Sequence, residues 1–220
     1  MKLPLRERKK IETRRRIVEV ADQLFKSNGF SGTTLDKIAD AANIHKITVL
    51  RYFQSKEAIA FDYRDEIYLI FKEELAARRG SVMDCWRAYV VRTAAVATQQ
   101  HRLIEKMQFI NSDPSLVAYQ LRLDVRYQRT LARSFSEEAG ADPDNDIFAR
   151  SLAALLVAGN ASVAQMVLKS GSYDRLQQGC LAVIDLAEEF QRAHVEKASR
   201  AAADPPVSLP TPRLAPSRSR

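Results

Sequence analysis

The sequence predicts an all-α fold, in which a small N-terminal three-helix bundle with a helix-turn-helix precedes a larger all-helical C-terminal domain. Apolar residues recur every three to four positions through most of the chain, which is the period of an amphipathic helix. Capping residues and glycine or proline stops separate these segments, as at Asn28–Gly29 and Asp113–Pro114. No segment favours a strand.

Composition sets the size of the folded part. The 220 residues give room for one large or two small domains, and a hydrophobic content of 46% is ordinary for a globular protein. We expect a helix-turn-helix domain at 1–54 and a larger helical domain at 55–198. Residues 199–220 hold five of the eight prolines without helical periodicity, which predicts a disordered basic tail.

The segment from Thr33 to Phe53, TTLDKIADAANIHKITVLRYF, has the pattern of two short helices joined by a tight turn. Thr33 is a candidate N-cap, with Asp36 three positions later in an acidic variant of the capping box. Asn43 tolerates the left-handed conformation that ends a helix and opens a turn. The second helix directs Val49 inward. Its outward polar side chains are Lys46, Thr48 and Arg51. In a helix-turn-helix, the second helix enters a DNA major groove.

Basic residues concentrate in the N-terminal part of the chain. Residues 1–53 hold 12 Lys and Arg against 6 Asp and Glu, whereas residues 54–198 hold 18 against 20 and residues 199–220 hold 4 against 1. The net charge of +7 therefore lies on the helix-turn-helix and on the tail. A basic face beside a helix-turn-helix is typical of a DNA-binding protein, although a basic N-terminus alone is more often solvated surface.

The other helices are expected from their apolar stripes and their caps. Their ranges are 7–28 ahead of the helix-turn-helix and 55–79, 82–100, 102–110, 114–139, 145–169 and 173–197 after it. Ser55 caps the helix at 55–79, and Ser81 with Asp84 opens the next. At ~1.5 Å per residue, the helix at 55–79 spans roughly 36 Å and is long enough to link the two domains rigidly.

The last two helices, at about 145–169 and 173–197, are apolar on more than one face. A helix with two apolar faces requires two partners. One face is expected to pack on its own core. The other is expected to meet the same helices of a second subunit in a four-helix bundle about a two-fold axis. The alternative is that both helices lie at the centre of a monomer.

Residues 13–61 closely resemble the TetR family of bacterial transcriptional regulators. A basic first helix ends in LFKSNGF, and TTLDKIADAANI and HKITVLRYFQSKEAI follow; the Tyr-Phe pair just ahead of Ser-Lys-Glu is the most specific feature. Beyond residue 61 the likeness is one of helix order and length. The resemblance implies a dimeric repressor that binds a palindromic DNA operator and releases it when a small-molecule effector enters the C-terminal domain.

The positions that match the family's motif imply the DNA contacts. Thr33 and Thr34 are expected at a phosphate. Lys46 and Thr48 are expected at bases or the groove edge, Ile47 at a thymine methyl group, and Arg51 at a base or a phosphate. Tyr52 and Lys56 match positions that contact the DNA backbone. Four residues depart from the family's usual pattern: Asn43 stands for glycine, His45 for serine, Ile47 for a small residue and Leu50 for an aromatic residue. The operator sequence is therefore not transferable.

Aromatic and soft side chains on three successive helices are candidates for lining an apolar ligand pocket. They are Trp86, Tyr89, Met107, Phe109, Tyr119 and Tyr127. Asn160, within an apolar helix, is a candidate polar group of the same pocket or a group that bonds across the dimer. Such aromatic residues are more often plain core, so a filled core is the alternative. A bound ligand is expected to swing the helix at 55–79 and to move the two recognition helices from the ~34–36 Å spacing of successive major grooves.

Other classes of protein find little support in the sequence. GxSxG, HExxH, CxxC and phosphate-binding glycine-rich motifs are absent, and His45, His101 and His194 are far apart, so no enzyme, metal site or cofactor is expected. No segment approaches the ~20 apolar residues of a membrane span, and no signal peptide is evident. Cys85 and Cys180 fit reduced thiols in a cytoplasmic protein. The alternative function is a helix-turn-helix protein that docks on DNA, answers to a protein partner and has no pocket.

Overall fold

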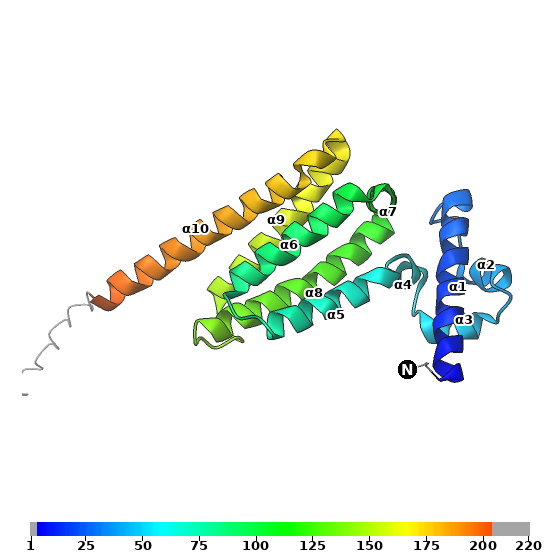
Figure 1. The fold of residues 1–220 in the computed structure, drawn as a ribbon, viewed down its shortest axis with the longest axis horizontal. Coiled ribbons are helices and arrows are strands. Elements are labelled where there is room, and N and C mark those ends of the chain that lie inside the picture. Colours follow the sequence, from blue (N-terminus) through cyan, green and yellow to red (C-terminus); the bar gives the residue numbers. More distant parts are fainter. Residues whose placement is uncertain (1–3, 204–220) are drawn as a thin grey trace, which may run out of the picture.

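The computed structural model describes residues 4–203 of the chain, and these form an all-helical fold, as predicted. The N-terminal bundle consists of α1 (Leu5–Asn28), α2 (Leu35–Ala41) and α3 (Lys46–Tyr52). It is followed by α4 (Lys56–Ala60), α5 (Asp62–Ala76), α6 (Val82–Gln99), α7 (His101–Asn111), α8 (Pro114–Glu138), α9 (Ile147–Ser170), the 3-10 helix η1 (Tyr173–Arg175) and α10 (Leu176–Ala203). Figure 1 shows the N-terminal bundle at one end of the molecule, with the long helices of the larger domain extending away from it.

Side-chain caps fix several helix starts where the sequence predicts them. The Ser55 hydroxyl accepts a hydrogen bond from the Ala58 amide at 3.2 Å, which starts α4. Ser81 and Asp84 form a complete capping box at the start of α6. Asp113 caps α8 and is followed by proline at the first helical position. These local signals explain why most element boundaries can be found from the sequence alone.

Two predicted helix starts are displaced. Thr34, not Thr33, caps α2, and its hydroxyl accepts a hydrogen bond from the Lys37 amide at 3.2 Å. Helix α9 begins at Ile147, two residues after the predicted 145, with Asp146 as its cap, because Asp142 and the residues after it form a turn ahead of the helix.

The helix predicted at 55–79 is in fact two helices, α4 and α5. Phe61, at the junction, has φ −105° and ψ 22°, which is outside helical geometry. Its side chain is buried against Tyr119 of α8, with ring centroids 5.2 Å apart. Neither glycine nor proline marks this break, which is why the apolar periodicity predicted one continuous helix.

Two clusters of buried side chains form the cores. The smaller core joins α1 to α4 with Ile110 of α7 and Leu116 of α8, and the larger core joins α5, α6, α8, α9 and α10. The smaller core extends beyond residue 54, to Ile59 and Phe61. The end of α7 and the start of α8 therefore connect the N-terminal bundle with the rest of the chain.

The helices α9 and α10 run antiparallel and approach each other closely at two glycines. A Cβ atom on Gly159 would lie 2.6 Å from Cγ1 of Val183, and one on Gly179 would lie 2.6 Å from Cγ1 of Val163. Valine is stiff about χ1 and cannot move aside cheaply, so both positions require glycine. The two contacts fix the register of α9 against α10.

Both helices carry exposed apolar side chains, among them Met166 of α9 and Leu186 of α10. By length and composition α9 is long and apolar enough to cross a membrane, and 28% of its most apolar part is buried. This differs from the expectation that no segment approaches a membrane span. In the chain, however, α9 packs between α8 and α10.

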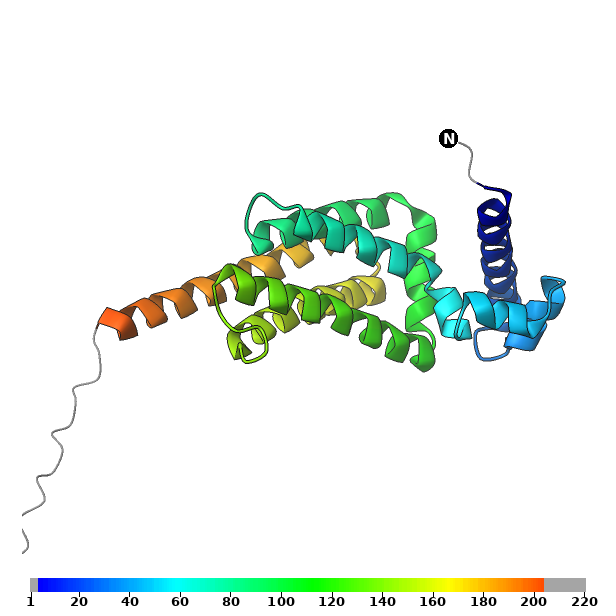
Figure 2. The same cartoon turned by 90° about the horizontal axis from the view of Figure 1, so that it is seen from below.

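Helix α10 is longer than predicted. It continues through Ala203, so residues 199–203 are helical and the predicted disordered tail begins too early. Figures 1 and 2 show the C-terminal part of α10 projecting beyond the other helices. Residues 204–220, which hold the rest of the predicted tail, lie outside the described residues.

Candidate DNA-binding surface and ligand cavity

The turn between α2 and α3 has the predicted geometry. Asn43 adopts a left-handed conformation with φ 53°. Its amide donates to the Asp40 carbonyl at 3.0 Å, and the Ile44 amide donates to the Ala39 carbonyl at 3.0 Å. Val49 is fully buried and anchors α3 on the bundle, as expected. The opposite face of α3 is consequently left toward solvent.

That exposed face of α3 contains most of the residues predicted to contact DNA. Ile47 is 68% exposed, and Arg51 is exposed without a hydrogen bond or ion pair to any residue of the described part. Lys46 is also exposed, with Nζ 2.8 Å from Oδ2 of Asp36 on α2. A surface ion pair of this kind is worth ~0–1 kcal/mol, so DNA can displace it at little cost. Thr48 and Tyr52 are half-buried, at the edges of the face.

Residues near the two helix starts are exposed as well. Thr34 uses its hydroxyl to cap α2 and remains exposed. His45 precedes α3 at the N-cap position, but its side chain makes no capping hydrogen bond and is exposed. The first half of α1 adds a further group of exposed basic side chains: Arg6, Arg8, Lys9, Lys10, Arg15 and Arg16.

Two residues predicted to contact DNA have internal roles instead. Thr33 is fully buried, and its hydroxyl lies 2.9 Å from the Gly29 carbonyl and 3.2 Å from the Leu24 carbonyl. The prediction of a phosphate contact by its side chain is therefore wrong. Lys56 donates from Nζ to the Phe30 carbonyl at 2.8 Å, and its Nζ lies 4.1 Å from the centroid of the Phe30 ring. Lys56 thus ties α4 to the loop after α1.

A cavity of about 420 Å³ lies within the larger domain and is lined by residues of α5 to α10. Five of the predicted ligand-binding residues line it: Trp86, Tyr89, Met107, Tyr127 and Asn160. Small-molecule sites in proteins typically occupy ~300–1,000 Å³. The core between these helices is therefore not filled.

Phe109 and Tyr119, the other two predicted ligand-binding residues, lie outside the cavity. Phe109 stacks on Phe25 of α1, with ring centroids 5.7 Å apart. It follows Met107 by two positions, and residues at that spacing point to opposite sides of a helix. Tyr119 packs on Phe61 instead; it lies eight residues before Tyr127, or ~12 Å along α8 toward the N-terminal bundle.

Aromatic rings form one wall of the cavity. Trp86 and Tyr89 of α6 stack with ring centroids 5.3 Å apart, and the Tyr89 hydroxyl donates to the Tyr127 hydroxyl at 3.1 Å. Burial raises the pKa of both tyrosines above the ordinary value, so they are neutral hydrogen-bonding groups at physiological pH. Trp86 Nε1 is buried and has no hydrogen-bond partner.

A buried ion pair, whose two residues are not among those predicted from the sequence, faces the same cavity. Arg64 of α5 donates to Oδ1 of Asp124 of α8 at 2.8 Å. Burial raises the pKa of the Asp124 carboxyl, and the Arg64 charge opposes that rise. One feature of the sequence could have indicated Asp124, because it lies three residues before Tyr127 and therefore on the same face of α8.

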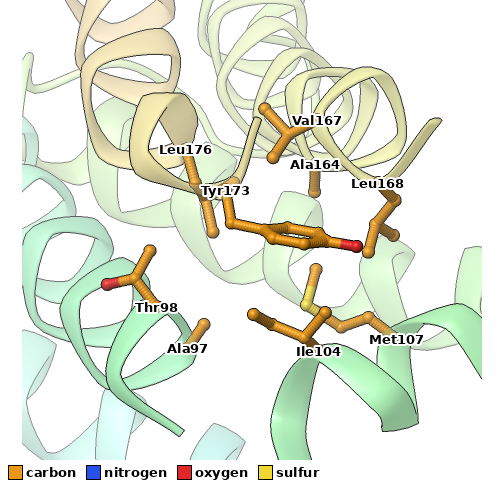
Figure 3. A pocket seen from close by; sticks show the side chains of 9 residues that line it. All are labelled: Ala97, Thr98, Ile104, Met107, Ala164, Val167, Leu168, Tyr173 and Leu176. Atoms are coloured by element: carbon orange, nitrogen blue, oxygen red, sulfur yellow. The ribbon is translucent and has the colours of Figure 1, made fainter. Parts of the chain in front are cut away.

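The apolar end of the cavity lies where α7, α9 and α10 meet. A second cavity of about 10 Å³ there shares Met107, Leu168 and Leu176 with the larger one. Figure 3 shows the Tyr173 ring lying between Leu168 and Val167 on one side and Met107 and Ile104 on the other. The Tyr173 hydroxyl accepts a hydrogen bond from Gln108 at 2.8 Å.

Comparison with known proteins agrees with the helix-turn-helix and with the helical domain behind it. Residues 17–63 match the family described as "Bacterial regulatory proteins, tetR family". The chain is 30% identical over 163 residues to the HTH-type transcriptional regulator TcmR of Streptomyces glaucescens. The matched region covers 70% of this chain and 72% of TcmR. This protein belongs to the TetR family.

Solved structures of TetR-family regulators share the fold. Thermus thermophilus FadR, a transcriptional repressor in complex with lauroyl-CoA, aligns with a TM-score of 0.58 and 22% identity over 80% of this chain and 94% of FadR. Stenotrophomonas maltophilia SmeT in complex with triclosan aligns with a TM-score of 0.57 and 18% identity over 95% of this chain and 99% of SmeT. The relatives of this chain are transcriptional regulators.

In this TetR-family regulator, α7 touches both the cavity and the N-terminal bundle. Leu103 and Met107 line the cavity. From the same helix, Nζ of Lys106 lies 3.3 Å from Oδ1 of Asp22 on α1, and Phe109 packs in the smaller core. Helix α7 is therefore a direct mechanical connection between the two regions.

Proposed function

We propose that this TetR-family protein is a cytoplasmic, ligand-responsive transcriptional repressor, which binds a palindromic operator as a homodimer and is released by a small apolar or amphipathic effector. The observation that carries this proposal is the cavity of about 420 Å³, whose wall includes a helix that also packs in the core of the helix-turn-helix bundle. The complexes of FadR with lauroyl-CoA and of SmeT with triclosan support it.

The DNA contacts are proposed to come from the exposed face of α3 and from its surroundings. Arg51 and Lys46 supply positive charge, Ile47 supplies an apolar contact to a thymine methyl group, and Thr48 and Tyr52 lie at the edges of the face. Thr34 and the basic start of α1 add contacts to the phosphates. Thr33 and Lys56 are left out of this surface because they are engaged within the bundle.

The homodimer is proposed to form through α9 and α10. Their outward apolar side chains include Leu155 and Met166 on α9 and Leu186 and Phe190 on α10, all of which are exposed in the single chain. A contiguous apolar face of this kind calls for a covering partner. The same face of a second copy would cover it in an isologous four-helix contact, which also supplies the second recognition helix that a palindromic operator requires.

Effector binding is proposed to act through α5 and α7. Expansion of the cavity would push α7 against α1 and would bend the chain at Phe61, between α4 and α5, in place of the swing of one long rigid helix. A ligand achieves this only if it binds the released state more tightly than the DNA-bound state.

The alternative of a DNA-docking protein governed by a protein partner requires a filled core between α5 and α10. The cavity in that region argues against it.

The direct test starts with selection of bound sequences from a random DNA pool by the purified protein. We expect a palindromic consensus, bound by one dimer, and loss of the complex when a compound that fills the cavity is added. Binding that remains unaffected by every compound shown to occupy the cavity would reject ligand control and favour the alternative.

A further inference from the structure

The wall of the cavity is suited to a flat ring system. Trp86, Tyr89 and Phe71 contact one another within 5.5 Å between ring centroids, and Tyr127 joins them. Aromatic surfaces pack best against other aromatic rings in offset-stacked or edge-to-face arrangements. Three of these four side chains line the cavity directly.

Three side chains that line the cavity hold buried polar atoms without partners: Asn160, Trp86 and Arg64, whose Nε is unpaired. Asn160 has neither a donor for its Oδ1 nor an acceptor for its Nδ2, and Trp86 lacks an acceptor for Nε1. Buried polar groups are nearly always hydrogen-bonded, because an unpaired one is costly. Asn160 lines the cavity, so a bound ligand is placed to supply its missing partners.

An amide needs a complementary pattern of two atoms. Asn160 offers one acceptor and two donor hydrogens. A ligand that satisfies both amide atoms places a donor next to an acceptor, as the N–H and C=O of a lactam or a carboxamide do. The Trp86 Nε1 group provides a further donor for an oxygen of the same ligand.

The charges that face the cavity are already paired. Nη2 of Arg64 donates to Asp124, which neutralises the charge but leaves the Arg64 Nε as one spare donor, and Nη2 of Arg92 lies 2.6 Å from Oε2 of Glu74. A charged ligand would lose its hydration without gaining a free counter-ion among the described lining residues. The site thus favours an uncharged molecule.

We propose that the cavity binds an uncharged, flat aromatic compound with adjacent hydrogen-bond donor and acceptor groups, which pair with Asn160, while its rings lie against Trp86 and Tyr89. This inference names the class of effector for the proposed repressor and rests on that proposed function.

The probe is phenanthridin-6(5H)-one, a three-ring lactam, and it is compared with its N-methyl derivative, which keeps the rings and the carbonyl but lacks the donor. Trp86 is the single tryptophan of the chain, so quenching of tryptophan fluorescence reports binding at the cavity itself. We expect saturable quenching by the lactam and binding that is about tenfold weaker for the N-methyl compound, as one lost hydrogen bond predicts. Laurate, an anion with an apolar chain, is expected to bind more weakly than either.

The Asn160→Leu variant tests whether Asn160 is the group that distinguishes the lactam from its N-methyl derivative. Leucine has a similar volume and no polar atoms, so the preference for the lactam over its N-methyl derivative should fall from about tenfold to about one. Asn111→Ala is the matched control, because Asn111 also lines the cavity but its Nδ2 already donates to the Met107 carbonyl at 2.9 Å. This control should keep the tenfold preference.

Equal binding of the two lactams to the unaltered protein, or tighter binding of laurate, would overturn the inference even if Asn160→Leu failed to fold. A mobility-shift assay with the selected operator separates this inference from the proposed function. Lactam binding with the expected preference but without release of DNA would reject ligand control and uphold the recognition chemistry. Release by laurate but not by the lactam would uphold ligand control and reject the chemistry.

Discussion

Arg51 and Lys56 are two cations close to the recognition helix, but their environments differ. Arg51 projects from α3 into solvent, whereas Lys56 is held by backbone carbonyls and by the face of Phe30. Their charges therefore serve different ends: one is available to DNA, and the other stabilises the loop that connects α1 with α2.

Substitution should separate these two roles. Arg51→Ala is expected to weaken operator binding by about tenfold or more, as loss of a base or phosphate contact predicts, with an unchanged melting temperature. Lys56→Met should instead lower the free energy of unfolding by ~1.5–3 kcal/mol, the usual worth of hydrogen bonds to a charged group. A mobility-shift titration and thermal unfolding of both variants measure these effects. Undiminished DNA binding by Arg51→Ala would remove that residue from the proposed surface.

The buried tyrosines of the cavity make stability depend on pH in the alkaline range. The pKa of Tyr89 and of Tyr127 is raised by burial above the ordinary 10.0. In the unfolded chain these groups lose their protons near pH 10, while the folded protein retains them. Their contribution to stability is thus fully present below pH 10 and is lost as the pH rises above it.

The Tyr127→Phe variant removes one of these groups. Between pH 10 and 11 its unfolding free energy should fall less steeply than that of the unaltered protein, by ~1.4 kcal/mol per pH unit for the tyrosine removed. Urea unfolding at pH 9, 10 and 11 provides the comparison. Parallel slopes for the two proteins would contradict the assigned burial effect.

On α3, the sequence predicts correctly which residues point inward and which point outward. The prediction is less accurate for residues that contact α1. Val49 and Asn43 behave as predicted because each is determined by its own helix or turn. Phe109 and Thr33 do not, since their partners lie on α1, whose position relative to them is a tertiary matter.

Helices α9 and α10 illustrate how an element with two apolar faces is used. One face packs on the other helices of the same chain, and the opposite face is left exposed. Gly159 and Val183 belong to the first face, where they contact each other. A charge at either position would disturb the chain itself, so the proposed dimer needs a test at outward residues.

Met166→Glu on α9 and Leu186→Glu on α10 are expected to yield folded monomers, because each places a carboxylate in the proposed apolar contact. Met166 is 62% exposed and Leu186 is 59% exposed in the single chain. Leu69→Glu on α5 and Leu121→Glu on α8 alter comparably exposed leucines elsewhere and should remain dimeric. Size-exclusion chromatography with light scattering distinguishes the two outcomes. Dimers in all four variants would place the interface on another surface.

The sequence identified most helices because their caps lie within a few residues of the segments they begin. The break at Phe61 escaped notice because it depends on a contact with Tyr119, far away in the chain. Helix α10 also exceeds its predicted end, since its last residues, Ala201 to Ala203, favour a helix without any apolar stripe to reveal it.

For the whole molecule, the decisive question is how the cavity and the DNA-binding surface influence each other. The α7 helix presents Met107 to the cavity and Lys106 to α1. A second polar contact links the regions, between Oγ of Ser31 and Oδ2 of Asp113 at 2.9 Å. These contacts couple the two sites only if ligand binding and DNA binding each change the position of α7.

Lys106→Met should leave the affinities for operator and for ligand, each measured alone, within about twofold, while it reduces the loss of DNA affinity that a bound ligand causes. The quantity to measure is the ratio of operator dissociation constants with and without saturating ligand. Arg133→Met is the matched control, because it removes an exposed ion pair with Glu137 within α8. An unchanged ratio in Lys106→Met would exclude the contact between Lys106 and Asp22 as the route.

The sequence could not predict that the larger domain contains a cavity. Trp86, Tyr89 and Tyr127 have the same periodicity whether their rings fill a core or border an open space. The difference depends on how six helices pack together, and the ion pair between Arg64 and Asp124 forms only in that packing.

The two glycine–valine contacts between α9 and α10 have a consequence for movement. Because Gly159 meets Val183 and Gly179 meets Val163, these helices cannot slide past each other without steric collision. They act as a fixed pair, so a change of cavity volume is expected to involve the other lining helices, α5 to α8. The proposed dimer contact through α9 and α10 would therefore persist unchanged while the DNA-binding ends of the two subunits move.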